Sequence, residues 1–456
     1  MNIPKSIQKV IDRIKGAGGR ALLVGGAVVD IIQGRDPKDW DLEVHGLELC
    51  ALEDALAEFA PCEVGRSFGI FKVRVEGFDV DLSIPRRDNR TGSGHKGFTV
   101  ECDPTLTPKE AARRRDFTIN SLFLDLETGD IVDPFGGLAD LEAGILRATD
   151  PAKFVEDPLR ALRAVQLLAR KAKTVDPATV ELIRGMGGEF DTLPRERVFE
   201  EWSKLLLKAD KPSIGLEFLR ECGWLVHFPE LEALIDCPQN PEWHPEGDVW
   251  IHNCLVVDAA AQVRHEIPED WRLAFMLGAL LHDVGKPSTT VLPVCTAHGH
   301  DAKCVPIARA FLDRITNQSE LIARVEALVH NHLRPFQLVG KAKPAAWKRL
   351  HRKVGRLDVL GWLSRADWAG RGGRDPLTPA ENGVTVEHPA SAACFSFFNE
   401  LGDEPIKPVI LGRHLIAEGH KPGRAFAPAL AAAFEAQLDH PEWGRDELLK
   451  VAVGSI

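Results

Sequence analysis

The sequence predicts an α/β head, a small mixed sheet with helices, followed by a mostly α-helical remainder. Up to about residue 150, short apolar segments alternate with polar residues, which is typical of half-buried strands. From about Asp150 onward, apolar residues recur every three or four positions, which is typical of amphipathic helices. At 456 residues the chain is also too long for one core, so we expect several domains.

Five segments of the head are predicted to be strands. The first runs into Gly25 and Gly26, and the segment AVVDIIQ after them has apolar residues at helical spacing and ends at Gly34. A glycine pair at a strand-to-helix junction lets backbone N–H groups approach a phosphate. The five segments are ALLVG from Ala21, WDLEVH from Trp40, IFKVRV from Ile70, FDVDLSI from Phe78 and SLFLDL from Ser121.

The helical remainder is interrupted by a stretch at 237–245 that holds three prolines and is predicted to be a linker. With the change of pattern near residue 150, this stretch predicts four regions. They are a head at 1–150, a helical neck at 151–240, a second helical domain at 241–390 and a helical tail at 391–456.

Composition favours a cytoplasmic protein. No run approaches 18 apolar residues, so we expect no membrane span, and the N-terminal segment lacks the apolar stretch of a signal peptide. The nine cysteines include no C-x-x-C pair and suit free thiols in a reducing compartment. The net charge of −11, taken alone, argues mildly against a nucleic-acid partner, because phosphate contacts need Lys and Arg.

Two carboxylates follow the glycine pair. Asp39 and Asp41 are two residues apart on a predicted strand, so both face one side. Such a D-x-D pair alone is more typical of a solvated edge strand, but the preceding glycines favour a site. Two close carboxylates are unfavourable unless a cation lies between them, and Mg²⁺ suits this role. A third carboxylate is expected on a neighbouring strand, where Asp79 and Asp81 share a face and Asp81 is the candidate.

Three further motifs follow in order: ARRRDFTIN, VDPFGG and FVEDPLRALR. Together with the glycine and aspartate pairs, they resemble the class II nucleotidyltransferases, the CCA-adding tRNA nucleotidyltransferases and bacterial poly(A) polymerases of the polymerase-β superfamily. The resemblance implies template-independent transfer of nucleotides from CTP and ATP to the tRNA 3′ end, with Mg²⁺ on Asp39 and Asp41 and with Asp81 as a further catalytic residue. The implied nucleotide-binding residues are Gly25, Gly26, Arg115, Asp116, Asn120, Asp157, Arg160 and Arg163.

The last motif suggests how a base is selected. Asp157, Arg160 and Arg163 are spaced by three, which places them on one helical face. A carboxylate acceptor beside a guanidinium donor suits cytosine and adenine, which both offer an amine and a ring nitrogen. A surface ion pair is the simpler alternative. Arg115 is expected to neutralise the triphosphate, with Arg113 and Arg114 facing RNA or solvent. The glycine-rich stretch DNRTGSGHKG is predicted to be a mobile loop.

One position departs from the family pattern G-G-x-V-R-D. Val29 stands where the family has an arginine that contacts the incoming nucleotide. A valine offers no guanidinium donors to a phosphate. Loss of such a charged hydrogen bond is expected to weaken nucleotide binding by roughly 1.5–3 kcal/mol.

A second site is predicted at LAFMLGALLHDVGKP, where His282 and Asp283 end an apolar helix. Burying this pair is costly without a metal or strong hydrogen bonds. The run resembles the HD phosphohydrolase superfamily, whose ligands follow the order H…HD…D, so the 241–390 domain is expected to be of HD type. The resemblance implies His252 and Asp367 as the other ligands, a transition metal such as Ni²⁺, Mn²⁺ or Zn²⁺, and phosphatase or 2′,3′-cyclic phosphodiesterase activity. His300, His330 and His332 are further candidates.

A basic segment from Gly340, GKAKPAAWKRLHRKVGR, offers a phosphate-binding surface, although a solvated helix face explains it equally well. Its RNA-binding candidates are Lys348, Arg349, Arg352 and Lys353. Three alternatives to a CCA-adding enzyme stay open: a poly(A) polymerase, an HD phosphohydrolase whose head only binds RNA, and a silent RNA-binding protein. A monomer or a homodimer is expected.

Overall fold

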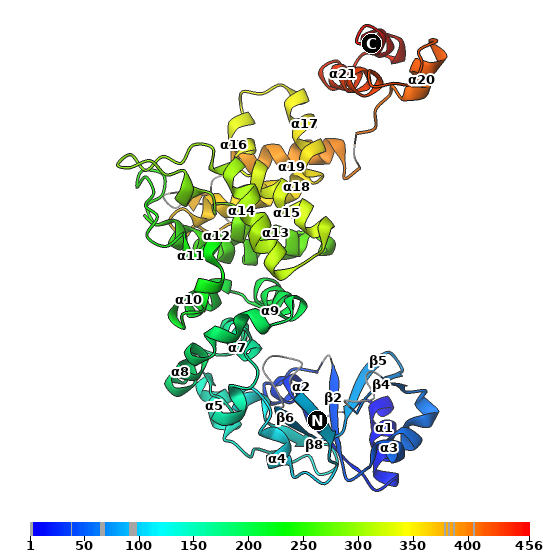
Figure 1. Ribbon diagram of the computed structural model, residues 1–456, viewed down its shortest axis with the longest axis vertical. Coiled ribbons are helices and arrows are strands. Elements are labelled where there is room, and N and C mark those ends of the chain that lie inside the picture. Colours follow the sequence, from blue (N-terminus) through cyan, green and yellow to red (C-terminus); the bar gives the residue numbers. More distant parts are fainter. Residues whose placement is uncertain are drawn as a thin grey trace. The chain divides into compact units, whose positions relative to one another are not determined.

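The computed structural model describes residues 3–37, 39–63, 69–90, 98–377, 380–381, 384–385, 388–404 and 406–456. The chain forms two compact units (Figure 1). The first unit is Met1–Ala209 with Ile214–His227, and it holds the predicted head and most of the predicted neck. The second is Asp210–Ser213 with Phe228–Ile456, and it holds the remaining predicted regions.

A seven-stranded mixed sheet forms the core of the first unit, in the order β3-β4-β5-β2-β1-β8-β9. Neighbouring strands are antiparallel except β2 and β5, which are parallel. The strands are β1 (Arg20–Val24), β2 (Trp40–His45), β3 (Cys62–Glu63), β4 (Ile70–Val75), β5 (Phe78–Ser83), β8 (Phe123–Asp125) and β9 (Ile131–Val132). All five predicted strands are confirmed. The edge strands β3 and β9 were not predicted, because two residues are too few to form a recognisable β-like run.

One face of this sheet is apolar. Leu42 and Val44 of β2 belong to a buried cluster that also contains Ile7 and Ile14 of α1 (Lys5–Gly16) and Leu52 of α3 (Leu49–Leu56). Figure 1 shows α1 and α3 beside each other next to the sheet, and the two helices are in contact. Since alternate residues of a strand point to opposite faces, the polar residues of β2 lie on the other face. That face carries the candidate site.

The first unit contains further strands and helices besides this sheet, α1 and α3. The glycine-rich stretch runs from β6 (Arg86–Arg90), which pairs with β7 (Phe98–Cys102), while its residues 91–97 lie outside the described residues. The helices are α2 (Gly26–Ile32), α4 (Pro108–Ala112), α5 (Gly137–Ala143), α6 (Pro151–Phe154), α7 (Leu159–Lys171), α8 (Pro177–Gly185), α9 (Arg195–Lys208) and α10 (Pro212–Glu221), with short strands β10 (Ile145–Leu146) and β11 (Thr174–Val175). The boundary between the units passes through α10.

The second unit is helical, as expected. Helices α12, α13, α15 and α18 pack together, and Gly370 allows close approach, because a Cβ there would lie 2.4 Å from a methyl group of Val256. No described helix is long and apolar enough to span a membrane. The helices are α11 (Pro229–Glu232), α12 (Val249–Val263), α13 (Glu269–Leu281), α14 (His300–Ile315), α15 (Ser319–Asn331), α16 (Arg334–Leu338), α17 (Pro344–Val354), α18 (Leu357–Gly370), α19 (Pro389–Leu401), α20 (Gly412–Ala417), α21 (Phe426–Asp439) and α22 (Arg445–Val453), with short strands β12 (Ala380–Glu381) and β13 (Val384–Thr385).

The predicted tail contains two kinds of structure. Helix α19 packs on α18, where Ser391 Oγ donates to the carbonyl of Gly361 at 2.8 Å. Helices α20 to α22 instead share a small apolar core of their own. This core consists of Ile410, Leu415, Ala429, Ala433, Leu448 and Ala452.

The VDPFGG motif forms the turn before α5. Asp133 accepts hydrogen bonds from the backbone N–H groups of Gly137 at 2.7 Å and Leu138 at 3.0 Å. A Cβ at Gly137 would lie 2.2 Å from the carbonyl oxygen of Thr118, in the preceding motif. The glycine therefore allows two motifs of the head to meet backbone to backbone.

We expect Gly137→Ala to lower the free energy of unfolding of the first unit by about 2 kcal/mol or more, because the clash is with a backbone oxygen. The matched control is Gly185→Ala at the end of α8, where an added Cβ meets nothing within 4 Å. That control should change the free energy by about 1 kcal/mol or less, in the stabilising direction. Urea unfolding of both variants measures this difference, and equal effects would contradict the assigned role of Gly137.

Candidate active site

Three carboxylates meet at β2 and β5. The parallel register places Asp41 directly opposite Asp81, and Asp39 immediately precedes β2. Burial raises the pKa of Asp41, and the charges of Asp81 and Asp39 raise it further. Lys72 lies 3.2 Å from Asp81. This repulsion among all-oxygen donors fits a hard divalent cation such as Mg²⁺. Asp79, the other candidate on β5, is 77% exposed and lies 3.7 Å from Arg74.

A cavity of about 1010 Å³ opens beside Asp39 and Asp41, whereas Asp81 is not among the residues that line it. Gly25 lies at its edge with a positive φ of 70°, and a Cβ there would be 3.9 Å from Asp41 Oδ2. The cavity brings together Asp39, Asp41 and every residue predicted to bind the nucleotide. These are Gly25, Gly26, Arg115, Asp116, Asn120, Asp157, Arg160 and Arg163, joined by Arg86, Arg114, Glu156, Gln166, Leu167, Arg170, Lys171, Arg197 and Lys204.

A buried carboxylate that we did not predict holds the arginines of this cavity. Glu43 of β2 is fully buried and accepts a hydrogen bond from Arg115 at 3.1 Å. Arg114 lies 3.4 Å and His45 3.2 Å from the same carboxylate. Burial by itself raises the pKa of Glu43, but these partners, Arg115 first, lower it to about 2. The extended pattern D-x-D-x-E could have identified Glu43, because it shares a strand face with Asp41.

Of Arg113 and Arg114, only Arg113 lies as expected, with a side chain that is 58% exposed. Both were expected to face RNA or solvent, yet Arg114 lies against Glu43 and lines the cavity. Arg113 lies 2.8 Å from Asp150. The physical reason is that a buried carboxylate is costly without cations, so Glu43 draws in Arg114 together with Arg115.

Asp116 connects this segment to α7. Its buried carboxylate accepts hydrogen bonds from Arg163 at 2.7 Å and from Asn120 at 3.1 Å. Burial raises the pKa of Asp116, but Arg163 and the hydrogen bonds lower it below its ordinary value. Asp116 and Asn120 were predicted to bind the nucleotide. In the structure their contacts hold α7 at the wall of the cavity.

Asp157 and Arg160 are each held in place by other residues and not by each other. Asp157 precedes α7, where it accepts from the N–H of Leu159 at 3.1 Å and from Arg197 at 3.1 Å. Arg160 donates to the carbonyls of Lys153, at 2.7 Å, and Arg114. Within the described chain the two residues form no ion pair with each other, so the simple surface-pair interpretation does not apply. Sequence spacing could not identify Arg197, which comes from α9.

Val29 is fully buried in α2. It is absent from the residues that line the cavity. The structure therefore agrees with the expectation that this position supplies no contact to a nucleotide.

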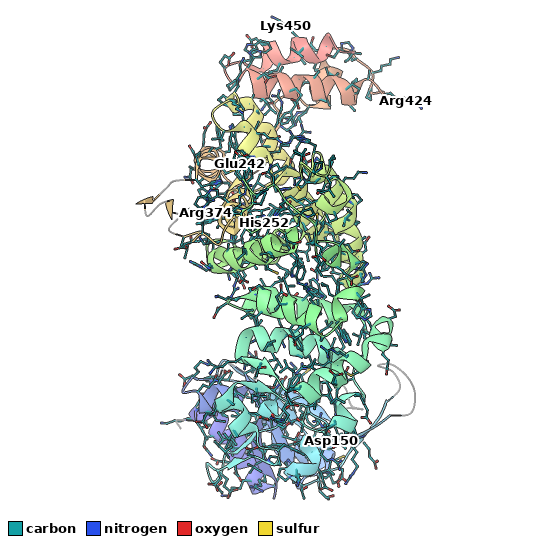
Figure 2. All side chains as sticks on the ribbon, turned by 90° about the vertical axis from the view of Figure 1, so that its left-hand side faces the viewer. Asp150, Glu242, His252, Arg374, Arg424 and Lys450 are labelled. Carbon is teal, nitrogen blue, oxygen red and sulfur yellow. The ribbon has the colours of Figure 1, made fainter. Side chains whose placement is uncertain are left out.

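The second unit brings the predicted HD residues together. His252 of α12 lies 3.2 Å from Asp367 of α18 and 3.6 Å from Asp283, and His282 lies 3.2 Å from Asp283. Figure 2 shows His252 among the helices of this unit. Three groups of residues each offer potential ligand atoms that lie within 4.8 Å of one another. They are His252 with His282 and Asp367, Asp283 with His300 and His332, and His252 with His244 and Glu246; His330 belongs to none of them.

The four histidines of this cluster are all held through Nδ1, so that Nε2 is the nitrogen that faces the carboxylates. Nδ1 of His282, His300 and His332 each bonds to a backbone carbonyl, at 2.9, 2.7 and 2.7 Å. Nδ1 of His252 lies 2.7 Å from Glu246, which was not predicted. Their Nε2 atoms are left to face the carboxylates, and His282 Nε2 is buried without a hydrogen bond among the described residues. Such outer bonds are typical of histidines that bind a metal. A cavity of about 380 Å³ adjoins the cluster.

Part of the basic segment that begins at Gly340 packs against α21. Arg349 of α17 lies 2.6 Å from Glu435 and 2.7 Å from Asp439, both on α21. Arg352 lies 3.7 Å from Glu435, with its guanidinium over the ring of Phe434. These arginines join α17 to α21. RNA binding by the segment stays a prediction that rests mainly on Lys348 and on the exposed Lys353.

We expect Glu43→Gln to lower the free energy of unfolding at pH 7 by about 3 kcal/mol, because buried arginines lose their counter-ion. The folded pKa of about 2 lies below the ordinary 4.5, so the charge of Glu43 stabilises the fold above pH 4.5. That stabilisation is lost as the pH falls toward 2. Urea unfolding at pH 7 and pH 3.5 should therefore show a smaller acid effect in Glu43→Gln than in the wild type.

The control for this experiment is Glu58→Gln, which removes an exposed ion pair with Arg13. It should change stability by less than about 1 kcal/mol. Equal acid sensitivity of the wild type and Glu43→Gln would show that Glu43 does not stabilise the fold by its charge.

Comparisons with known proteins agree with this geometry. Residues 21–147 match the family described as poly A polymerase head domain, and residues 174–235 match the one described as probable RNA and SrmB-binding site of polymerase A. The Bacillus stearothermophilus CCA-adding enzyme, solved in complex with CTP, superposes with a TM-score of 0.67 over 97% of this chain and 94% of that chain. Its sequence identity is 22%, so this likeness shows the fold.

Sequence relatives extend over most of the chain. The multifunctional CCA protein of Neisseria gonorrhoeae is 38% identical over 328 residues, 70% of this chain and 75% of that protein. The multifunctional CCA protein of Nitrosospira multiformis is 34% identical over 365 residues, 78% of this chain and 84% of that protein. With the head motifs and the cavity that they form, these matches show that the chain belongs to the family of multifunctional CCA proteins.

Proposed function

We propose that this protein adds CMP and AMP, from CTP and ATP, to the 3′ end of tRNA without a template, in CCA addition and repair. The observation that carries the proposal is the single cavity in which Asp39 and Asp41 meet the arginines of α7. The relatives are named for CCA, and the solved relative holds CTP. The cofactor is a divalent metal ion, and we propose Mg²⁺ on Asp39 and Asp41, with Asp81 beside them.

In the proposed reaction, the 3′-hydroxyl oxygen of the tRNA attacks the α-phosphorus of the nucleotide. A new P–O bond forms, the bond to the β-phosphate breaks, pyrophosphate leaves, and the hydroxyl proton passes to solvent. Asp39 and Asp41 would hold a divalent ion, which when bound would supply positive charge to the hydroxyl and to the leaving group. Arg115, fixed by Glu43, faces the triphosphate without having to reorganise, which is the general advantage of preset charge.

Base selection is proposed for Asp157 and Arg160. The carboxylate accepts the exocyclic amine of cytosine or adenine, and the guanidinium donates to a ring nitrogen. Arg197 holds Asp157, and backbone carbonyls hold Arg160. These fixed positions give the protein a preformed hydrogen-bonding pattern in place of a template.

A second activity is proposed for the HD-type cluster of the second unit. We propose that His252, His282, Asp283 and Asp367 bind Ni²⁺, Mn²⁺ or Zn²⁺ in a phosphatase or 2′,3′-cyclic phosphodiesterase that trims damaged RNA ends. The supporting observation is that four buried histidines direct Nε2 toward two carboxylates. Mixed nitrogen and oxygen donors suit a transition metal.

The remaining proposals concern the cellular location of the protein, its contacts with tRNA and its oligomeric state. A cytoplasmic location is supported by nine free cysteines. Lys348 and Lys353 are proposed to contact tRNA phosphates. A monomer or homodimer stays the expectation.

The test of the main proposal uses purified protein, a tRNA that ends before CCA, labelled CTP and ATP, and Mg²⁺. Wild-type protein should incorporate both nucleotides, and Asp41→Asn should lower kcat by roughly 10³-fold or more, because a metal-binding carboxylate is lost. Asp79→Asn, on the neighbouring strand but outside the cavity, is the matched control and should keep its activity. Incorporation of AMP alone would favour a poly(A) polymerase, and incorporation of neither nucleotide by tRNA-bound protein would refute the proposal.

For the second unit, we expect Asp283→Asn to abolish the binding of Ni²⁺ or Mn²⁺ measured by calorimetry, together with hydrolysis of 2′,3′-cyclic AMP. Nucleotide incorporation should be unchanged, because Asp283 lies in the other unit. His330→Ala removes a nearby histidine that belongs to none of the three ligand groups, and it should leave metal binding intact. Full metal binding by Asp283→Asn would rule out the proposed site.

A further inference from the structure

Lys171, the last residue of α7, reaches the glycine pair of the active-site cavity. Its side chain is 17% exposed and lines the cavity. A Cβ built on Gly26 would lie 3.8 Å from its ammonium nitrogen. Neither the family motifs nor the predicted site residues include this lysine.

The ammonium of Lys171 lacks a full counter-ion. It makes no hydrogen bond to the residues that the structure describes, and the carboxylate near it, that of Asp30, is 3.8 Å away. Asp30 already accepts a hydrogen bond from Arg35 at 2.8 Å, and it also interacts with Arg170. Burial lowers the pKa of Lys171, and the charge of Asp30 offsets part of this effect. A half-buried cation that shares one carboxylate with two arginines indicates that an anion binds here.

The position of the ammonium identifies the anion. Asp41 Oδ2 lies beside Gly25, and Lys171 Nζ lies beside Gly26, so the glycine pair separates the carboxylates from the ammonium. A nucleotide whose α-phosphate reacts at Asp41 would extend its other phosphates past these glycines, where no side chain obstructs them. The group that meets Lys171 is then the part that leaves as pyrophosphate.

The same volume is where a long side chain at position 29 would go. In a helix, a side chain points toward the N-terminus and covers the preceding turn, so residue 29 covers residues 25 and 26. Val29 has no ionisable group and is fully buried, so it supplies no charge there. The cation beside Gly26 comes instead from α7.

We propose that Lys171 binds the β- and γ-phosphates of the incoming CTP or ATP and the pyrophosphate product, supplying from α7 the positive charge that position 29 lacks. This inference rests on the proposed nucleotidyl transfer, in which the P–O bond to the β-phosphate breaks and pyrophosphate leaves as an anion. Lys171 contacts this leaving group and takes no part in proton transfer.

The experiment compares the full-length wild type with Lys171→Met, which keeps most of the length of the side chain and removes its charge. KM for CTP and for ATP should both rise roughly 10- to 100-fold, the effect of losing one charged hydrogen bond. The inhibition constant of inorganic pyrophosphate should rise by a similar factor. Lys171→Arg should recover most of the affinity for the nucleotides and for pyrophosphate, because it restores a cation.

Lys208→Met is the matched control, since Lys208 is exposed, influences Lys171 electrostatically and does not line the cavity. It should leave both constants unchanged. If the wild type incorporates nucleotides and Lys171→Met keeps its KM and its pyrophosphate inhibition, the inference is wrong while the proposed function stands. If Lys171→Arg is as impaired as Lys171→Met, the charge is not what matters, and the inference is also wrong. If the wild type incorporates neither nucleotide, the proposed function fails and the inference fails with it.

Discussion

The cavity of the candidate active site depends on the ion pairs that the buried carboxylate of Glu43 forms with arginines. One face of β2 is sealed by the apolar core beneath α1 and α3, so Glu43 can obtain its partners only from the other face. It draws Arg114 and Arg115 onto the sheet. The next residue, Asp116, then binds Arg163 of α7. Two successive buried ion pairs thus link the strand that carries Asp41 to the helix proposed to select the base.

Each unit holds a candidate metal site, and the two sites differ in the donor atoms that they offer. In the first unit the donors near the proposed metal are carboxylates alone, which suits a hard ion and leaves room for phosphate oxygens. In the second unit, backbone carbonyls and Glu246 occupy Nδ1 of the histidines, so the Nε2 atoms face the carboxylates. In the second unit, the buried Nε2 of His282 has no hydrogen-bond partner among the described residues, which is a structural sign of a ligand.

The sequence could predict features that depend on the spacing of residues and on the order of motifs along the chain. Short β-like runs located five strands of the head, and the shared face of Asp79 and Asp81 led to the carboxylate that the register places opposite Asp41. Contacts between distant elements carry no such signal, as with Arg197, which holds Asp157 across 40 residues of sequence. Charge composition was also insufficient to identify an RNA-binding surface. Arg349, a predicted RNA-binding residue, forms ion pairs with acidic residues of α21.

The burial of Val29 shows why a phosphate contact can move between elements. Ala27, Val28 and Val29 are all buried, so α2 is fixed by its apolar side chains and needs no charged residue to hold it in place. A phosphate requires positive charge at a point in space, whichever helix provides it. The last turn of α7 is a favourable source, because a lysine there also interacts well with the C-terminal end of the helix dipole. Since Asp116 and Arg163 already fix α7 against the cavity, Lys171 can reach Gly26 without any change in the backbone of the head.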